Sequence, residues 1–94
     1  MIRVTKYYEA KGDGPLKGTF WIEIATWHME IRDLTEWQKG SNWWVSMPSK
    51  QFEVDGQKKY MPYVKLEEEA HNRFLVAVKE ALRSYKHQNG MFSL

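Results

Sequence analysis

The sequence predicts an α+β fold: an antiparallel β-sheet of four or more strands with a projecting β-ribbon, followed by one long C-terminal α-helix. Two observations lead to this prediction. Apolar and polar residues alternate from Gly18 to Ala25, as they do in a half-buried strand. From Leu66 to about Lys86 the apolar residues instead recur every three or four positions, which places them on one face of a helix.

The first two strands are predicted on either side of a loop at Ala10 to Lys17. Arg3 to Glu9 is rich in β-branched and aromatic residues, and Gly12-Asp13-Gly14-Pro15 ends this strand, because glycine and proline favour the dihedral angles of turns. In the second strand, alternation places one set of apolar residues on a single face, namely Phe20, Ile22 and Ile24.

A third strand is expected from about His28 to Trp37 and a fourth from Trp43 to Met47. Leu34 breaks the alternation of the third strand, which indicates a β-bulge or a change of parity. Turn residues fill Gln38 to Asn42 between the two strands. The fourth strand should stop at Pro48, because proline has no amide hydrogen to donate.

Two further strands are predicted to form the ribbon. Gln51 to Val54 and Lys58 to Val64 flank the pair Asp55-Gly56, which suits a tight hairpin. The sheet is therefore expected to end in a projecting hairpin.

The C-terminal helix is predicted from a stripe of apolar residues: Ala70, Phe74, Ala77, Val78, Ala81 and Tyr85, widened by Leu75 and Leu82. Acidic residues lie in its first turn and basic residues towards its end, the order that the helix dipole favours. One face of this helix should pack on the sheet.

A chain of 94 residues is expected to form one domain, and a second copy would help to bury its apolar surface. The expected domain covers 1–94, with the sheet at about 2–64, the helix at about 66–86 and a loose tail at 87–94. No apolar run approaches the roughly 20 residues that cross a bilayer, and the first residues lack the apolar stretch of a signal peptide. We therefore expect a cytoplasmic protein, or one in the host cytoplasm if it is viral.

Several kinds of chemistry find little support in the sequence. Cysteine is absent, which excludes disulfides, thiolate zinc sites and cysteine nucleophiles. Glu68 and His71 have the spacing of a helical ligand pair, but one pair cannot close a metal site, and a solvated helix face is the better interpretation. No hydrolase, metalloprotease or phosphate-loop motif is present. We expect no catalytic residues, no metal and no cofactor.

The aromatic content calls for an explanation, because five tryptophans occur in this short chain. Phe20, Phe74 and Trp43 are expected to fill the interface between sheet and helix. Strand parity cannot bury both Trp43 and Trp44, so if Trp43 points towards the helix, Trp44 faces away from it. One indole must then meet solvent, a ligand or another subunit.

Basic residues accompany these aromatic residues. Between Lys39 and Lys65 there are five lysines and only two acidic residues, Glu53 and Asp55, although the net charge of the chain is only +2. A sheet face with Trp21, Trp37 and Trp44 beside these cations and Arg32 could stack unpaired bases while the cations follow the phosphates. An apolar dimer interface would expose the same rings.

From Met29 to Lys50 the run MEIRDLTEWQKGSNWWVSMPSK resembles the corresponding part of the SpoVG family of bacterial regulators, which are small dimeric proteins that bind DNA and RNA. The closest segment is WVSMPSK, which is followed by a charged hairpin containing Asp55-Gly56. The opening IRVTKYY and the closing amphipathic helix also match the layout of that family, so the resemblance spans most of the chain.

The order of elements is also similar to that of the eukaryotic transcriptional positive coactivators. In both, several strands precede one helix, which is entered here through Tyr63-Val64-Lys65-Leu66. This resemblance implies a dimer that grips single-stranded DNA with basic and aromatic β-ribbons.

We therefore expect a non-enzymatic homodimer that binds single-stranded DNA or RNA and acts in transcription or replication, with possible partners among the proteins of those processes. The residues expected to stack on bases are Trp37, Trp44 and Tyr60, and those expected to meet phosphates are Arg32, Lys39, Lys50, Lys58, Lys59 and Lys65. The alternative is a protein-interaction module or small regulatory subunit whose exposed tryptophans bury against a partner. A small enzyme ranks last.

Overall fold

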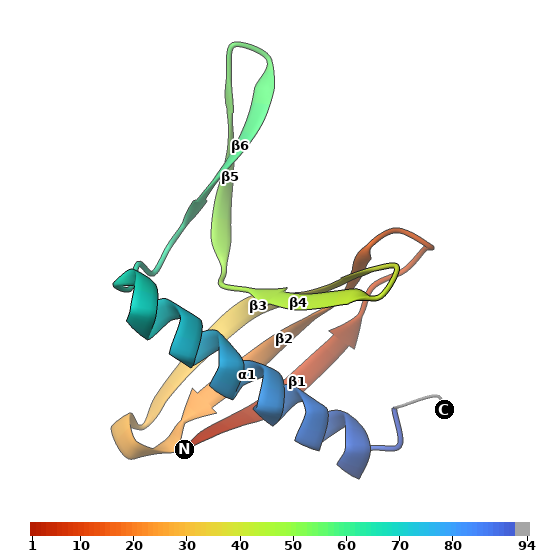
Figure 1. The fold of residues 1–94 in the computed structure, drawn as a ribbon, viewed down its shortest axis with the longest axis vertical. Helices are drawn as coiled ribbons and strands as arrows, with labels where there is room; N and C mark the ends of the chain where they lie inside the picture. The colour runs from red at the N-terminus through yellow and green to blue at the C-terminus, as the bar shows by residue number, and fades with distance from the viewer. Residues whose placement is uncertain (92–94) are drawn as a thin grey trace.

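The computed structural model describes residues 1–91 and contains a four-stranded antiparallel sheet, a separate two-stranded ribbon and one helix (Figure 1). The elements are β1 (Ile2–Glu9), β2 (Leu16–Ile24), a 3-10 turn (Ala25–Trp27), β3 (Met29–Lys39), β4 (Asn42–Ser46), β5 (Ser49–Val54), β6 (Gln57–Pro62) and α1 (Glu68–Gln88). The predicted α+β fold with a projecting ribbon and one C-terminal helix is thus confirmed. No helix in the described part of the chain is long and apolar enough to cross a membrane.

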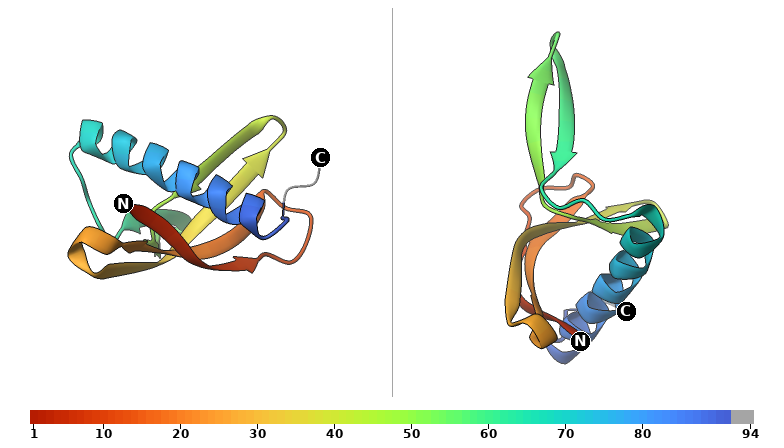
Figure 2. Two further views of the ribbon diagram at one scale, coloured as in Figure 1. Left: turned by 90° about the horizontal axis from the view of Figure 1, so that it is seen from below. Right: turned by 90° about the vertical axis from the view of Figure 1, so that its left-hand side faces the viewer.

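The sheet is a meander with strand order β1-β2-β3-β4, and α1 lies across one of its faces (Figure 2). We call the face covered by α1 the inner face and the opposite face the outer face. The ribbon of β5 and β6 extends away from both sheet and helix (Figure 1). Its turn has positive φ at Asp55 (51°) and Gly56 (78°), as the predicted tight hairpin requires.

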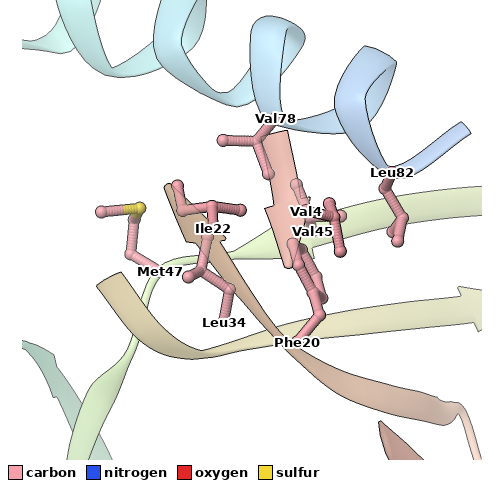
Figure 3. Packing of buried hydrophobic residues seen from close by; sticks show 8 residues of the cluster. All are labelled: Val4, Phe20, Ile22, Leu34, Val45, Met47, Val78 and Leu82. Carbon is pink, nitrogen blue, oxygen red and sulfur yellow. The ribbon is translucent and has the colours of Figure 1, made fainter. Parts of the chain in front are cut away.

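The hydrophobic core lies between the inner face and α1 (Figure 3). Every strand of the sheet and the helix contribute to it, and its fully or nearly buried members are Val4, Phe20, Ile22, Leu34, Val45, Met47, Val78 and Leu82. Burial of each large apolar side chain contributes about 1.5–3 kcal/mol. Of the three aromatic residues predicted at this interface, Phe20 is buried, and Trp43 and Phe74 pack against the core.

A β-bulge in β3 decides which residues face the helix. Ile31 pairs with Ile22 and Leu34 pairs with Phe20, so Arg32 and Asp33 together lie opposite a single residue of β2. Asp33 has a φ of 64°. The irregularity predicted near Leu34 is therefore confirmed, and the extra residue changes the parity of the rest of the strand.

Several predicted strand boundaries were wrong. β2 begins at Leu16 rather than Gly18, and Ala25 belongs to the 3-10 turn rather than to the strand. His28 adopts a left-handed conformation with a φ of 50°, which reverses the chain, so β3 begins one residue later. β6 ends at Pro62 rather than Val64, and the ribbon forms a sheet of its own instead of continuing the main sheet.

The helix also differs in detail from its prediction. It begins at Glu68 rather than 66 and continues to Gln88, so the first two residues of the predicted loose tail are helical, while 92–94 lie outside the described residues. Ala77 is exposed, although it was predicted in the buried stripe. Successive helix residues point about 100° apart, so Ala77 and Val78 cannot both face the sheet. The helix residues that are buried against the sheet are Val78 and Leu82.

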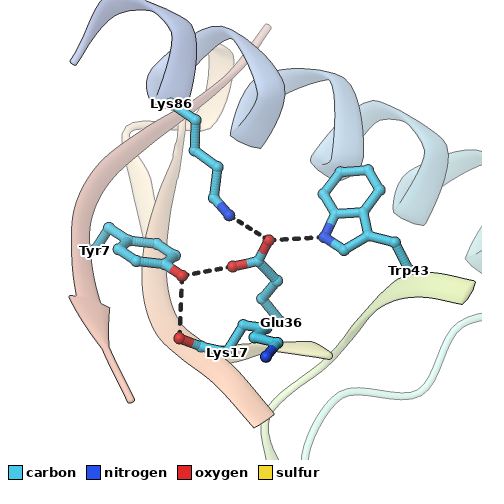
Figure 4. Close-up of polar contacts among 5 residues, drawn as sticks. All are labelled: Tyr7, Lys17, Glu36, Trp43 and Lys86. Carbon is cyan, nitrogen blue, oxygen red and sulfur yellow. Dashed lines mark hydrogen bonds and ion pairs between the residues drawn. The ribbon is translucent and has the colours of Figure 1, made fainter. Parts of the chain in front are cut away.

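A buried carboxylate lies beside the core (Figure 4). Glu36 of β3 is 1% exposed. Its Oε1 accepts a hydrogen bond from the Tyr7 hydroxyl of β1 at 2.5 Å, and its Oε2 accepts one from Trp43 Nε1 of β4 at 2.7 Å. Lys86 Nζ of α1 lies 2.5 Å from the same Oε2. These contacts join three strands and the helix at one group.

The surroundings of Tyr7 favour its neutral form. Burial first, and then the hydrogen bond and the charge of Glu36, raise the pKa of Tyr7 above its ordinary value of about 10. A Cβ at Gly18 would lie 2.5 Å from the Tyr7 hydroxyl oxygen, so only glycine leaves room for this ring.

We expect Lys86→Met to lower the free energy of unfolding by about 3 kcal/mol, because it leaves the Glu36 carboxylate buried without its cation. Urea denaturation followed by tryptophan fluorescence measures this change. Arg73→Met, at an exposed position of the same helix, is the control and should change stability by less than about 0.5 kcal/mol. Equal effects of the two substitutions would contradict a stabilising role for the ion pair.

Tyr7 should make the protein less stable in alkaline solution. Since its folded pKa is raised, the folded state keeps a proton that the unfolded chain loses above a pH of about 10, so its contribution is complete below that pH and is lost as pH rises further. Tyr7→Phe should flatten the decline of the unfolding free energy above this pH, measured by urea denaturation at each pH. A slope that is the same with and without Tyr7→Phe would contradict this role of Tyr7.

Candidate nucleic-acid interface

The outer face carries a pair of tryptophans on adjacent strands. Trp37 of β3 and Trp44 of β4 are cross-strand partners, and their rings are nearly parallel, with an interplanar angle of 7° and centroids 6.3 Å apart. Trp37 Nε1 donates a hydrogen bond to Thr35 Oγ1 at 2.8 Å, which fixes the orientation of the ring. Trp43 packs on the core while Trp44 is 40% exposed, so the predicted division of this tryptophan pair is confirmed.

These two rings line a groove between the outer face and the base of the ribbon. Its volume is about 470 Å³, within the range of about 300–1,000 Å³ that is usual for small-molecule sites. We call it the aromatic groove, and it is lined by Asp33, Thr35, Trp37, Trp44, Ser46, Met47, Ser49 and Tyr60. Tyr60 comes from β6 and is 67% exposed. All three residues predicted to stack on bases therefore line one groove, although they come from two separate sheets.

Asp33 brings a carboxylate to this groove. It occupies the bulge of β3, and its left-handed φ of 64° is a conformation that few residues other than glycine, asparagine and aspartate adopt readily. The sequence prediction did not include Asp33 in the site. One feature of the sequence pointed to Asp33, because this residue directly precedes the change of parity at Leu34. No sequence pattern, however, indicated where its side chain would lie.

Two cations lie over a third outer tryptophan. Lys6 Nζ is 4.6 Å from the centroid of the Trp21 ring, and the guanidinium carbon of Arg32 is 4.4 Å from it. Both distances lie within the limit of about 6 Å for a cation–π contact. Arg32 also pairs with Glu30 at 3.1 Å. Trp21 thus holds cations on the outer face and does not line the aromatic groove.

The other predicted cations are spread over several surfaces. Lys39 follows Trp37 by two positions, so strand alternation places it on the outer face. Lys58 and Tyr60 share one face of the ribbon, because each lies opposite a residue of the same β5 face, Glu53 and Gln51 respectively.

The remaining lysines do not join this surface. By the same alternation, Lys50 and Lys59 lie on the opposite face of the ribbon from Tyr60. Lys65 lies in the segment between β6 and α1. The structure therefore gathers the predicted aromatic residues and separates the predicted cations. Lys6, which the sequence prediction omitted, reaches Trp21 only because β1 pairs with β2 in this register.

Glu68 and His71, which have the spacing of a helical ligand pair, lie in the first turns of α1. Within residues 1–91, no three histidine, aspartate or glutamate side chains are placed to hold one ion.

The chain matches no protein-family model, no curated protein and no solved structure. The resemblances to the SpoVG family and to the transcriptional coactivators therefore stay predictions. Arguments about function rest on the geometry of the outer face and the ribbon.

Proposed function

We propose that this protein is a non-enzymatic homodimer that binds single-stranded DNA or RNA across its outer face and acts in transcription or replication. The observation that carries the proposal is the aromatic groove, where Trp37, Trp44 and Tyr60 surround one space of suitable size. Stacking of a base on an aromatic side chain contributes about 1–3 kcal/mol and tolerates different bases. Unpaired bases are the nucleic-acid parts that such a groove can accept, because the bases of a duplex are already stacked.

Cations lie beyond both ends of the groove, where the phosphates of a bound strand could contact them. Lys39 lies beyond Trp37 towards the β3–β4 turn. Lys6 and Arg32 are the two cations over the Trp21 ring, and they lie on the other side of Asp33. A strand running along β3 would place bases on the tryptophan pair and phosphates near these cations. Each phosphate contact releases counterions, so binding should weaken as salt is added.

The ribbon supports the homodimer. Phe52, Val54 and Met61 share the ribbon face opposite Tyr60, and Val54 and Met61 are exposed. An isolated two-stranded hairpin is only marginally stable in water, and within residues 1–91 the hydrophobic core includes no residue of this ribbon. A second copy that covers these three apolar side chains would bury them beside Lys50 and Lys59 of the same face, while Tyr60 on the opposite face would stay in the groove.

We expect Trp44→Ala to weaken the binding of a fluorescent single-stranded oligonucleotide between about fivefold and 150-fold, the loss of one stacked base. Fluorescence anisotropy measures the affinity at several salt concentrations, with a duplex of equal length for comparison. Trp27→Ala is the matched control, because Trp27 is 68% exposed but does not line the groove. The Trp27→Ala variant should bind the oligonucleotide with the same affinity as the unsubstituted protein.

Three results would contradict this proposal. If neither single strands nor duplexes bind, or if binding does not depend on salt, the groove would instead fit a protein partner, which is the alternative function. If Trp44→Ala and Trp27→Ala weaken binding equally, the strand would lie elsewhere on the molecule.

The dimer is tested by its mass in solution. Sedimentation equilibrium should give the mass of two chains for the unsubstituted protein and that of one chain for Met61→Lys, because the substitution removes an apolar side chain from this face and adds a third ammonium group directly opposite Lys50. Gln51→Lys adds the same charge on the opposite ribbon face and should stay dimeric. A monomeric unsubstituted protein would remove the homodimer from the proposal.

A further inference from the structure

The aromatic groove contains one charged side chain among the described residues that line it, that of Asp33. The residue is exposed, and its carboxylate takes part in no side-chain hydrogen bond or ion pair within residues 1–91. Nothing in the fold of the described chain uses this group. A negative charge beside three aromatic rings also repels phosphate, so the part of a strand that enters the groove is a base.

We propose that the aromatic groove selects guanine among unpaired bases, with Asp33 as the residue that reads it. This inference rests on the proposed function. An ionised carboxylate has two oxygens that only accept hydrogen bonds. Guanine offers two adjacent donors on its Watson–Crick edge, N1–H and the N2 amino group, and paired donors that meet both carboxylate oxygens give the strong bidentate geometry.

The other bases fit this carboxylate less well. Adenine and cytosine each place a ring nitrogen acceptor beside their amino donor, and thymine and uracil place carbonyl oxygens on both sides of N3–H. Each of these acceptors would face a carboxylate oxygen without a hydrogen between them, which is a repulsive contact. The larger ring system of a purine also covers more of the tryptophan pair.

Two hydroxyl groups near Asp33 complete the pattern. Thr35 and Ser46 are cross-strand partners that line the same groove. Thr35 Oγ1 accepts a hydrogen bond from Trp37 Nε1, so its own hydroxyl hydrogen is available to donate. A hydroxyl donor beside a carboxylate matches the edge of guanine, where the O6 acceptor lies next to the two donors.

The backbone holds Asp33 in place for this role. Asp33 lies in the bulge of β3 at the edge of the groove with a left-handed φ of 64°, and asparagine tolerates that conformation about as well as aspartate does. Asp33→Asn should therefore fold normally while it replaces one acceptor oxygen by an amide donor. Asp55→Asn is the matched control, since Asp55 has a φ of 51° in the ribbon turn and does not line the groove.

The test compares short oligothymidylates that carry guanine, inosine or thymine at one central position, with anisotropy as the readout. Guanine should bind at least about tenfold more tightly than thymine, and inosine, which lacks the N2 amino group, should fall between them. Asp33→Asn should abolish the preference for guanine, and Asp55→Asn should keep it. Circular dichroism establishes that both variants are folded.

The outcomes separate this inference from the proposed function. Equal binding of all three oligonucleotides, or a guanine preference that survives Asp33→Asn, overturns the inference and leaves single-strand binding intact. Absence of binding to every oligonucleotide overturns both. Guanosine monophosphate, used as a competitor, should bind the protein far more weakly than the guanine oligonucleotide does. Equal affinities would show that the groove binds a free nucleotide, and would overturn the assignment to a strand.

Discussion

The arrangement of sheet and helix depends on one buried carboxylate. Glu36 would be costly to bury alone, and its two oxygens are instead satisfied by Tyr7, Trp43 and Lys86 from β1, β4 and α1. Apolar contacts of the core have no direction, whereas these hydrogen bonds hold only when the helix crosses the inner face near Lys86. The carboxylate thereby fixes where α1 lies along the inner face, which the apolar core residues already assign to the helix.

The bulge of β3 links this buried network to the candidate site. Ile31 faces the core, and in a regular strand Trp37 would face the core with it, since alternate residues share a face. The additional residue at Arg32–Asp33 turns Glu36 inwards and Trp37 outwards instead. One local irregularity therefore creates the buried ion pair, the outer tryptophan pair and the position of Asp33 at the groove.

The charges of the outer face and of the ribbon are largely balanced by neighbouring charges of opposite sign. Arg32 is paired with Glu30, Lys58 lies opposite Glu53, and the whole chain has a net charge of only +2. Long-range attraction of phosphates is accordingly small. In the proposed complex, aromatic stacking would contribute most of the affinity, and the cations at the ends of the groove would orient the strand.

The sequence by itself determined the fold class, the helix, the tight Asp55-Gly56 turn and the outward side of Trp44, because periodicity and parity are local properties. Only the tertiary structure decided that Tyr60 of the ribbon lines the same groove as Trp37 and Trp44, and that Lys50 lies on the other ribbon face. Such placements depend on strand register and on how separate sheets are oriented, which arise from contacts between residues far apart in the chain.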